Sequence, residues 1–185
     1  MYRHIRPYLS RHEPRGHFHL HFKSTLGAML GLLAVGALAA WSGQPLLLAP
    51  LGATALLLFA HPKTPTAQPV NIFLGYLVGT VFASICEAMM PGSWWAAGFG
   101  VGGAMLVMLS LRITHPPASA MPLLMLTSHL PAVTLFMVVL AACLVLFTLA
   151  MIWHRLPPRQ IYPLTPPSLR LDEAKHPVLE LSKRE

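Results

Sequence analysis

The chain has 185 residues, of which 55% are apolar and 10% charged, and its mean hydropathy is +0.58. An ordinary soluble domain carries about 25% charged residues, so this composition excludes that class. The only charged residues between Ser24 and Trp153 are Lys63, Glu87 and Arg112. A block of that length with so few charges belongs in a lipid bilayer. The net charge of +7 therefore indicates orientation in a membrane rather than nucleic-acid binding.

Residues 1–23 form a basic, polar tail with five histidines, which we expect on the cytoplasmic side of the membrane. Three of these histidines, His17, His19 and His21, alternate with apolar residues. On a strand they would share one face and could hold a divalent metal, although no carboxylate or cysteine supplies a fourth ligand. Contact with lipid headgroups explains the same pattern. We expect no metal ion and no other cofactor.

Six apolar segments follow the tail, four of them long and two short. Each long segment covers about 27 Å or more as a helix, which is enough to cross the hydrocarbon layer. The short segments are interrupted by proline and cover less. The long segments are 24–41, 72–90, 94–111 and 132–153, and the short ones are 46–60 and 118–127. Residues 154–185 form a Pro-rich polar tail, expected on the cytoplasmic surface or disordered.

An internal similarity relates the two halves of residues 24–153. The run from Pro50 to Leu57 resembles the run from Pro117 to Leu124, and the same offset places the flanking long segments of one half near those of the other. If all six segments cross the membrane, every Lys and Arg falls on the cytoplasmic side with both termini. Each half then crosses the membrane three times. Because this number is odd, the two halves, roughly 24–90 and 94–153, are inverted repeats. The predicted fold is an all-α polytopic membrane bundle.

In such a plan the two short segments enter from opposite faces and meet near the middle of the membrane. Helix starts present free N–H groups and a partial positive charge, so two facing starts could bind an anion. Small residues there allow close approach, and the hydroxyls of Thr54 and Ser119 add donors. The alternative is that these residues only permit tight helix packing. The predicted substrate-binding residues are Gly52, Ala53, Thr54, Ala118, Ser119 and Ala120.

Further candidates for gating or proton transfer flank the short segments. His115, Pro116 and Pro117 follow Arg112 at the predicted inner mouth. His115 could gate, carry a proton or attract an anion, and it could equally tie the turn to a backbone carbonyl. His61 offers the same alternatives at the end of the other short segment. Glu87 is the single acid of the membrane block, and it either has a function or reaches the headgroups from a position close to a turn.

Three stretches of the chain resemble the HPP family of integral membrane proteins. They are residues 49–55, residues 59–71 and residues 111–118, and the last contains the His-Pro-Pro tripeptide that gives the family its name. Ser119 and Met121 depart from the family pattern, which more often has glycine and threonine there. The resemblance covers roughly residues 22–153. It implies a bundle of four or more transmembrane helices, and its plastid and cyanobacterial members imply nitrite as a substrate.

The sequence therefore predicts a multi-pass protein of the inner (cytoplasmic) membrane that transports or conducts a small anion, nitrite being the best candidate. Its expected partners are the lipid bilayer, the anion and further copies of the chain. No paired carboxylates, Walker loop or nucleophile–base motif occurs, so we expect no enzyme. The rival hypothesis is a non-transporting sensor or assembly factor whose His-rich tail binds a metal or a partner.

Overall fold

The computed structural model describes residues 16–128 and 130–164, and within these residues all regular structure is helical. The all-α prediction is therefore confirmed for this part of the chain. The four longer helices are α2 (Phe18–Ser42), α4 (Pro69–Met89), α5 (Trp94–Ser110) and α7 (Ala132–Arg155). The shorter elements are α3 (Ala49–Ala60), α6 (Met121–Ser128) and the 3-10 helices η1 (Pro65–Ala67) and η2 (Pro116–Ala120).

Three helices, α2, α4 and α7, are long and apolar enough to cross a membrane. The fourth predicted long span is α5, whose 17 residues cover about 25 Å. The predicted short segments are correctly placed. The first is the 12-residue helix α3, and the second is η2 continued by the eight-residue helix α6.

Helix α2 begins at Phe18, six residues before the start of the predicted apolar segment at Ser24, so the helix extends into the predicted tail. The backbone N–H groups of Leu20 and His21 both donate to the carbonyl of His17, which starts the helix. No proline or glycine follows until Gly27, so nothing interrupts the helix in the polar stretch. The strand conformation considered for the alternating histidines is consequently wrong.

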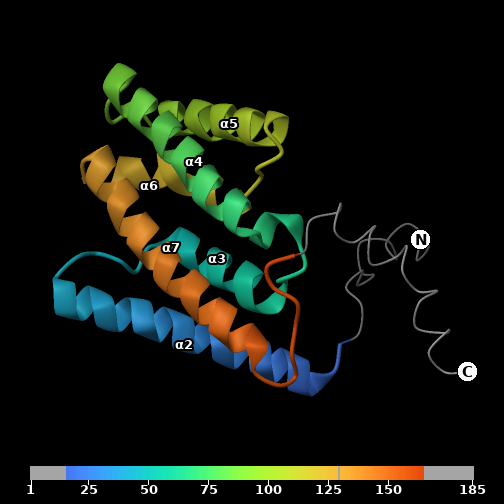
Figure 1. The fold of residues 1–185 in the computed structure, drawn as a ribbon. Helices are drawn as coiled ribbons and strands as arrows, with labels where there is room; N and C mark the ends of the chain where they lie inside the picture. The colour runs from blue at the N-terminus through green and yellow to red at the C-terminus, as the bar shows by residue number, and fades with distance from the viewer. Residues whose placement is uncertain (1–15, 129, 165–185) are drawn as a thin grey trace, which may run out of the picture.

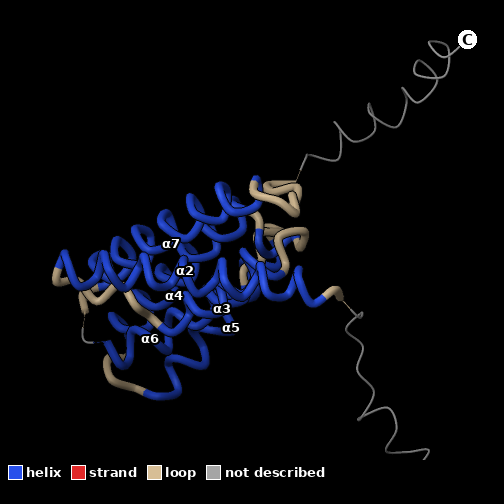
Figure 2. The backbone as a smooth tube through the Cα atoms, turned by 90° about the horizontal axis from the view of Figure 1, so that it is seen from below, coloured by secondary structure: helices blue, strands red, loops and turns tan. Residues whose placement is uncertain are grey.

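The helices run back and forth between the two ends of one bundle (Figures 1 and 2). The start of α2, the connector 61–68, the turn 111–115 and the end of α7 lie at one end, which we call the terminal end. The turns after α2, α4 and α6 lie at the other end. The connector and the turn at the terminal end carry Lys63 and Arg112.

The packing pairs of the two halves correspond to one another. Helix α2 packs on α3 and α7, while its counterpart α5 packs on α6 and α4. Likewise α7 packs on α3, and α4 packs on α6. Helices α4 and α7 pack on each other in the centre of the bundle. Each short helix is thus enclosed by the first long helix of its own half and the last long helix of the other half.

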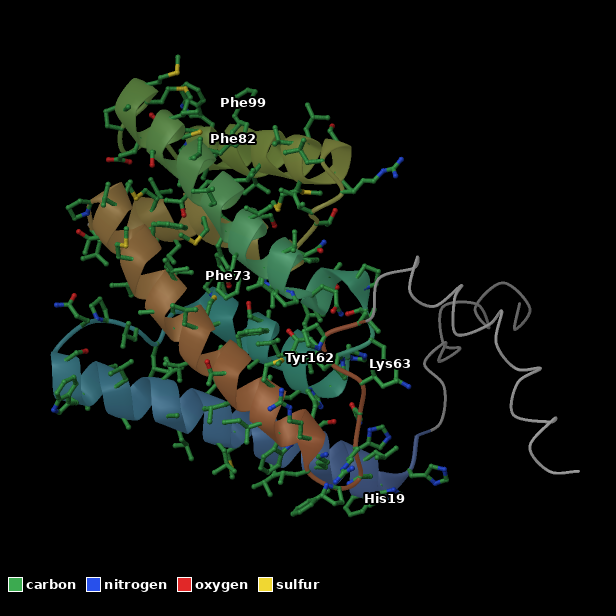
Figure 3. All side chains as sticks on the ribbon, viewed as in Figure 1. His19, Lys63, Phe73, Phe82, Phe99 and Tyr162 are labelled. Atoms are coloured by element: carbon green, nitrogen blue, oxygen red, sulfur yellow. The ribbon has the colours of Figure 1, made fainter. Side chains whose placement is uncertain are left out.

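The C-terminal segment, residues 156–164, folds back on the terminal end of the bundle and is ordered there. Tyr162 is 8% exposed, and its hydroxyl donates to the carbonyl of Ala67 at 2.9 Å. The amide of Leu164 donates to Oε1 of Gln68, whose Nε2 donates to the carbonyls of Pro62 and Thr64. Figure 3 shows Tyr162 beside the connector that carries Lys63. Residues 156–164 of the predicted polar tail thus pack on the surface of the bundle; residues 165–185 lie outside the described residues.

Candidate functional site

Three polar side chains meet in the interior of the bundle, where α3, α4 and η2 come together. Oγ1 of Thr54 lies 2.8 Å from the hydroxyl of Tyr76 and 3.0 Å from Nε2 of His115. Nδ1 of His115 lies 2.8 Å from the carbonyl oxygen of Thr66. None of the three side chains is more than 2% exposed. We call Thr54, Tyr76 and His115 the polar cluster.

The positions of the hydrogen atoms in the polar cluster follow from which groups can donate a hydrogen bond and which can only accept one. A carbonyl only accepts, so Nδ1 of His115 carries the proton that it donates to Thr66. In a neutral ring Nε2 can then only accept. The single hydroxyl proton of Thr54 can be donated to Nε2 or to the carbonyl of Pro50 at 3.2 Å, and the hydroxyl oxygen can accept from Tyr76. With that proton directed to Nε2, the hydrogen bonds run in one direction from Tyr76 to the connector, without a charge in the bundle.

Two glycines of α4 let η2 approach closely enough to form this cluster. A Cβ atom at Gly75 would lie 2.7 Å from Cβ of His115, and one at Gly79 would overlap the carbonyl oxygen of Ala118. Gly79 is near the middle of α4, whereas Gly75 and Tyr76 lie about one turn closer to the terminal end. The polar cluster therefore lies between the middle of the bundle and the connector, to which Nδ1 of His115 is hydrogen-bonded.

The predicted substrate-binding residues divide into two groups. Thr54 and Ala118 are buried, and the first belongs to the polar cluster. Gly52 and Ala53 are exposed, and no atom lies within 4 Å of a Cβ placed at Gly52. Ser119 and Ala120 are half-buried, and the hydroxyl of Ser119 donates to the carbonyl of Pro116 at 2.7 Å. The structure thus brings Thr54 to His115 and leaves Gly52 facing outward.

The two short segments also offer fewer free amide donors than the predicted anion site would require. Pro50, Pro116 and Pro117 have no N–H group. The amide of Leu51 donates to the carbonyl of Leu48, and the amide of Ala118 donates to that of His115. A ligand bound here would consequently rely on side-chain hydroxyls and the imidazole more than on the helix starts.

Three of the predicted gating residues, Pro116, Pro117 and His61, lie close to the polar cluster in the sequence, in η2 and at the end of α3. Pro116 is exposed and Pro117 is buried, and together they open η2 directly after His115. His61 ends α3, and its carbonyl accepts from the amide and the hydroxyl of Thr64. Asn71 at the start of α4 donates from Nδ2 to the carbonyl of Thr114 at 3.1 Å.

Arg112 occupies an unusual backbone position at the end of α5. Its φ of 58° is in the left-handed region, where glycine is the usual residue. The amide of Ile113 donates to the carbonyl of Met108 and the amide of Arg112 to that of Leu109, which is the Schellman pattern of hydrogen bonds.

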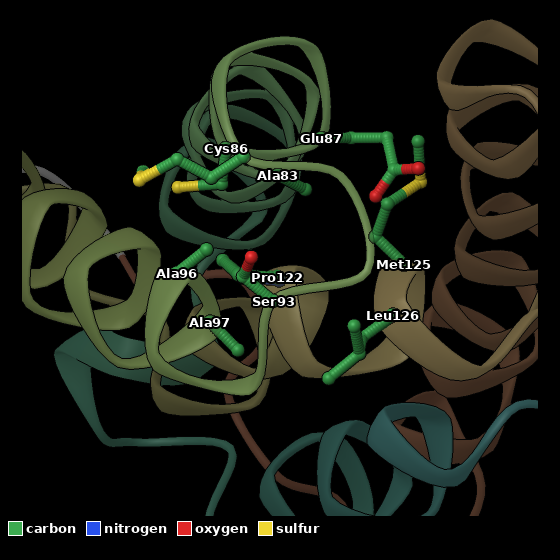
Figure 4. Close-up of a pocket in the computed structure, with 10 residues that line it drawn as sticks. Ala83, Cys86, Glu87, Ser93, Ala96, Ala97, Pro122, Met125 and Leu126 are labelled. Atoms are coloured by element: carbon green, nitrogen blue, oxygen red, sulfur yellow. The ribbon is translucent and has the colours of Figure 1, made fainter.

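Glu87 lies far from the polar cluster, toward the other end of α4. Its side chain is exposed and lines a small hollow of about 10 Å³ together with Ser93 and Met125, as Figure 4 shows. That volume holds about one water molecule. The structure therefore places Glu87 and His115 at different sites.

The three histidines near the N-terminus do not form a common face. His17 precedes α2, while His19 and His21 lie in its first turn. The rings of His17 and His19 stack with centroids 5.5 Å apart. Within the described residues no group of three His, Cys, Asp or Glu side chains is placed to hold a metal ion.

Three parts of this site were not predicted from the sequence. Tyr76 was not singled out, although an aromatic hydroxyl in the middle of an apolar helix needs a hydrogen-bond partner. Gly75 and Gly79 were not predicted either, although a spacing of four residues between glycines is typical of a close helix–helix contact. The role of Thr66 could not be predicted, because it acts through its backbone carbonyl.

Comparisons with known proteins agree with a membrane location. The chain is 26% identical over 155 residues to a transmembrane protein of Dictyostelium discoideum, covering 78% of the chain and 49% of that protein. It is 33% identical over 86 residues to a second Dictyostelium discoideum transmembrane protein, covering 44% of the chain and 28% of the relative. The chain thus spans half or less of the length of these relatives. No solved structure matches it.

The family assignment comes from a match over most of the chain. The family model for the HPP transmembrane region matches residues 13–163, which include the polar cluster, both short segments and nearly all of the described C-terminal segment. His115, Pro116 and Pro117 are the residues after which the family is named, and in this fold they open η2 at the polar cluster. The chain belongs to the HPP family of transmembrane proteins.

Proposed function

We propose that this protein is a transporter or channel for a small anion, with nitrite as the best candidate. The observation that carries the proposal is the polar cluster, because an imidazole and two hydroxyl groups are buried together inside an apolar bundle, and polar groups within a membrane mark a functional site by default. Membership in the HPP family is compatible with transport. The plastid and cyanobacterial members suggest nitrite as the anion.

The arrangement of the helices supports an inverted repeat. Both halves have the order long, short, long, and the helices that pack together in one half correspond to those that pack together in the other. In membrane transporters of this plan the substrate lies where discontinuous segments meet near the midplane. The polar cluster links the two discontinuous segments, since it joins α3 to the residue before η2, at a level nearer the terminal end than the middle of α4.

The charges of the described residues support an orientation with the terminal end in the cytoplasm of a cell, at its inner membrane. Lys63, Arg112 and Arg155 lie in the connector, the turn and the last turn of α7 at that end, whereas Glu87 lies toward the opposite end of α4. Lysine and arginine favour the cytoplasmic side of a membrane. Arg112 and Lys63 would then raise the local concentration of anions at the entrance.

A homo-oligomer belongs to the same proposal. Gly98 and Gly102, which lie one turn apart on α5, have no atom within 4 Å of an added Cβ. Exposed small residues at this spacing allow two membrane helices to approach closely.

Uptake into proteoliposomes tests the function. We expect the full-length protein to take up nitrite with saturation, and nitrate, formate and chloride to compete in proportion to their fit. Deletion of residues 1–15 should leave uptake intact. Absence of uptake of all four anions would contradict the proposal, and loss of a partner-binding activity on that deletion would favour the sensor hypothesis instead.

A further inference from the structure

A basic hollow lies at the terminal end of α7, away from the polar cluster. His154, Arg155, Arg159, Gln160 and Ile161 line it, and its volume is about 490 Å³. Ligand sites for small molecules in proteins typically have volumes of about 300–1,000 Å³. The hollow is therefore large enough for a lipid headgroup.

The loop that forms the hollow is fixed from behind. The amide of Gln160 donates to the carbonyl of His154 at 3.0 Å. Nζ of Lys23 donates to the carbonyls of Leu156 and Pro158 at 2.6 and 2.7 Å. Lys23 thereby holds the end of α7 and is occupied by backbone groups, so the cations left for a ligand are the two arginines.

Arg155 and Arg159 have no acidic partner among the described residues. Glu87 is the single acid in that part of the chain, and it lies toward the opposite end of α4. Both arginines are exposed. An arginine presents a planar fork of N–H donors that matches a phosphate group, and two of them beside one hollow favour a phosphate-bearing ligand.

His154 forms the buried wall of the hollow. It is 2% exposed, and its Nε2 donates to the carbonyl of Leu58 at 2.8 Å. Its other ring nitrogen, Nδ1, is buried and has no hydrogen-bond partner within the described residues. In the neutral ring this nitrogen can only accept a hydrogen bond, and no described group donates one to it.

Apolar side chains next to the arginines distinguish a lipid from a soluble phosphate. Ile152 is 53% exposed and lies three residues before Arg155, on the same face of α7 and one turn deeper in the bundle. Ile161 is 65% exposed and is itself part of the lining. Cationic groups with exposed apolar groups beside them, one of which, Ile152, lies a turn deeper along α7, match the two parts of a phospholipid.

We propose that this hollow binds an anionic phospholipid, with the headgroup phosphate held by Arg155 and Arg159 and the acyl chains lying along Ile152 and Ile161. This site is independent of the anion pathway, because it lies at the surface of the bundle and shares no residue with the polar cluster. The bound lipid would fix the end of α7 and the C-terminal segment to the membrane surface.

Titration of the purified full-length protein in detergent tests this proposal. The ligands are phosphatidylglycerol, phosphatidylcholine and inorganic phosphate, and binding is measured by native mass spectrometry and by the increase in melting temperature. The test variant is Arg155→Gln with Arg159→Gln. The control is Lys63→Gln with Arg112→Gln, which removes two cations from the same end of the bundle.

We expect phosphatidylglycerol to bind and to stabilise the wild type and the control alike. The test variant should bind it about 25-fold more weakly, since each cation near an anionic lipid surface contributes about a fivefold preference. The melting temperature of the lipid-free test variant should equal that of the wild type, because both arginines are exposed. Equal binding by the test variant, equal binding of phosphatidylcholine, or full stabilisation by phosphate alone would each overturn the lipid assignment.

Discussion

The hydroxyl of Thr54 links two side chains from other elements, so a change at this single residue affects three parts of the bundle. Tyr76 comes from α4 and His115 from the turn before η2. A methyl group in place of the hydroxyl would leave the ring nitrogen of His115 without a donor, at a cost of about 1–3 kcal/mol for a buried unsatisfied group. Serine would keep the bonding atom and lose one methyl group.

Arg112 permits a prediction in which stability and function change in opposite directions. Replacement by glycine should stabilise the protein by about 1 kcal/mol, since glycine accepts the left-handed backbone without a steric penalty. Alanine should give no such gain. If the arginine concentrates anions at the entrance, both variants should show a raised KM for uptake at low ionic strength, and the difference from wild type should shrink as salt is added.

Thermal unfolding in detergent and uptake in proteoliposomes measure the two effects separately. A glycine variant no more stable than the alanine variant would show that the strain at residue 112 is relieved elsewhere. An unchanged KM in both variants would remove Arg112 from the entrance.

At the scale of elements, the fold depends on how closely η2 approaches α4. Alanine at Gly79 would place a Cβ against the carbonyl oxygen of Ala118, a backbone atom that cannot turn aside. We expect Gly79→Ala to lower the free energy of unfolding by about 1–3 kcal/mol or more, as for other overpacked sites, and to separate His115 from Thr54.

Gly52→Ala is the matched control on the exposed face of α3. A Cβ at Gly52 meets no atom within 4 Å, so this change should be neutral or stabilising by up to about 1 kcal/mol. Denaturant unfolding in detergent measures both variants. Equal stability of the two would contradict the close contact between η2 and α4.

The positions of the helices could be predicted from the sequence wherever a run of apolar residues defines the helix. The apolar runs located all six helical segments, because a segment in lipid must be apolar throughout. The start of α2 could not be predicted, since Lys23 and the histidines made residues 18–23 look like a tail. The structure explains the helix there by the hydrogen bonds of Lys23 to the carbonyls of Leu156 and Pro158, which are far away in the sequence.

The site was predictable only in part for the same reason. Thr54 and His115 were identified because polar residues are rare in apolar segments. Their contact, and the outward position of Gly52, depend on how α3 is rotated about its own axis. The rotation is set by packing against α2 and α7, which no local pattern in residues 46–60 reveals.

At the scale of the whole molecule, the six-crossing topology can be tested by labelling single cysteines in a protein that lacks Cys86 and Cys143. Lys63→Cys and Arg112→Cys should react from the cytoplasmic side, and Gln44→Cys and Pro91→Cys from the outside, because these exposed residues lie in turns at the two ends of the bundle. Outside labelling of residue 63 or 112 would show that a short segment returns to the face from which it entered.

The proposal that a small anion passes the polar cluster is tested most directly by the initial rate of nitrite uptake in three reconstituted proteins: wild type, Thr54→Ser and Thr54→Val. Thr127→Val, which removes an exposed hydroxyl of α6, serves as the control. Each protein is first shown to be folded and inserted in equal amount. The account predicts that Thr54→Ser and Thr127→Val retain most of the wild-type rate while Thr54→Val loses at least about 90% of it, as expected when a hydrogen bond to a charged solute is lost. Uptake by folded Thr54→Val at the wild-type rate would contradict the account.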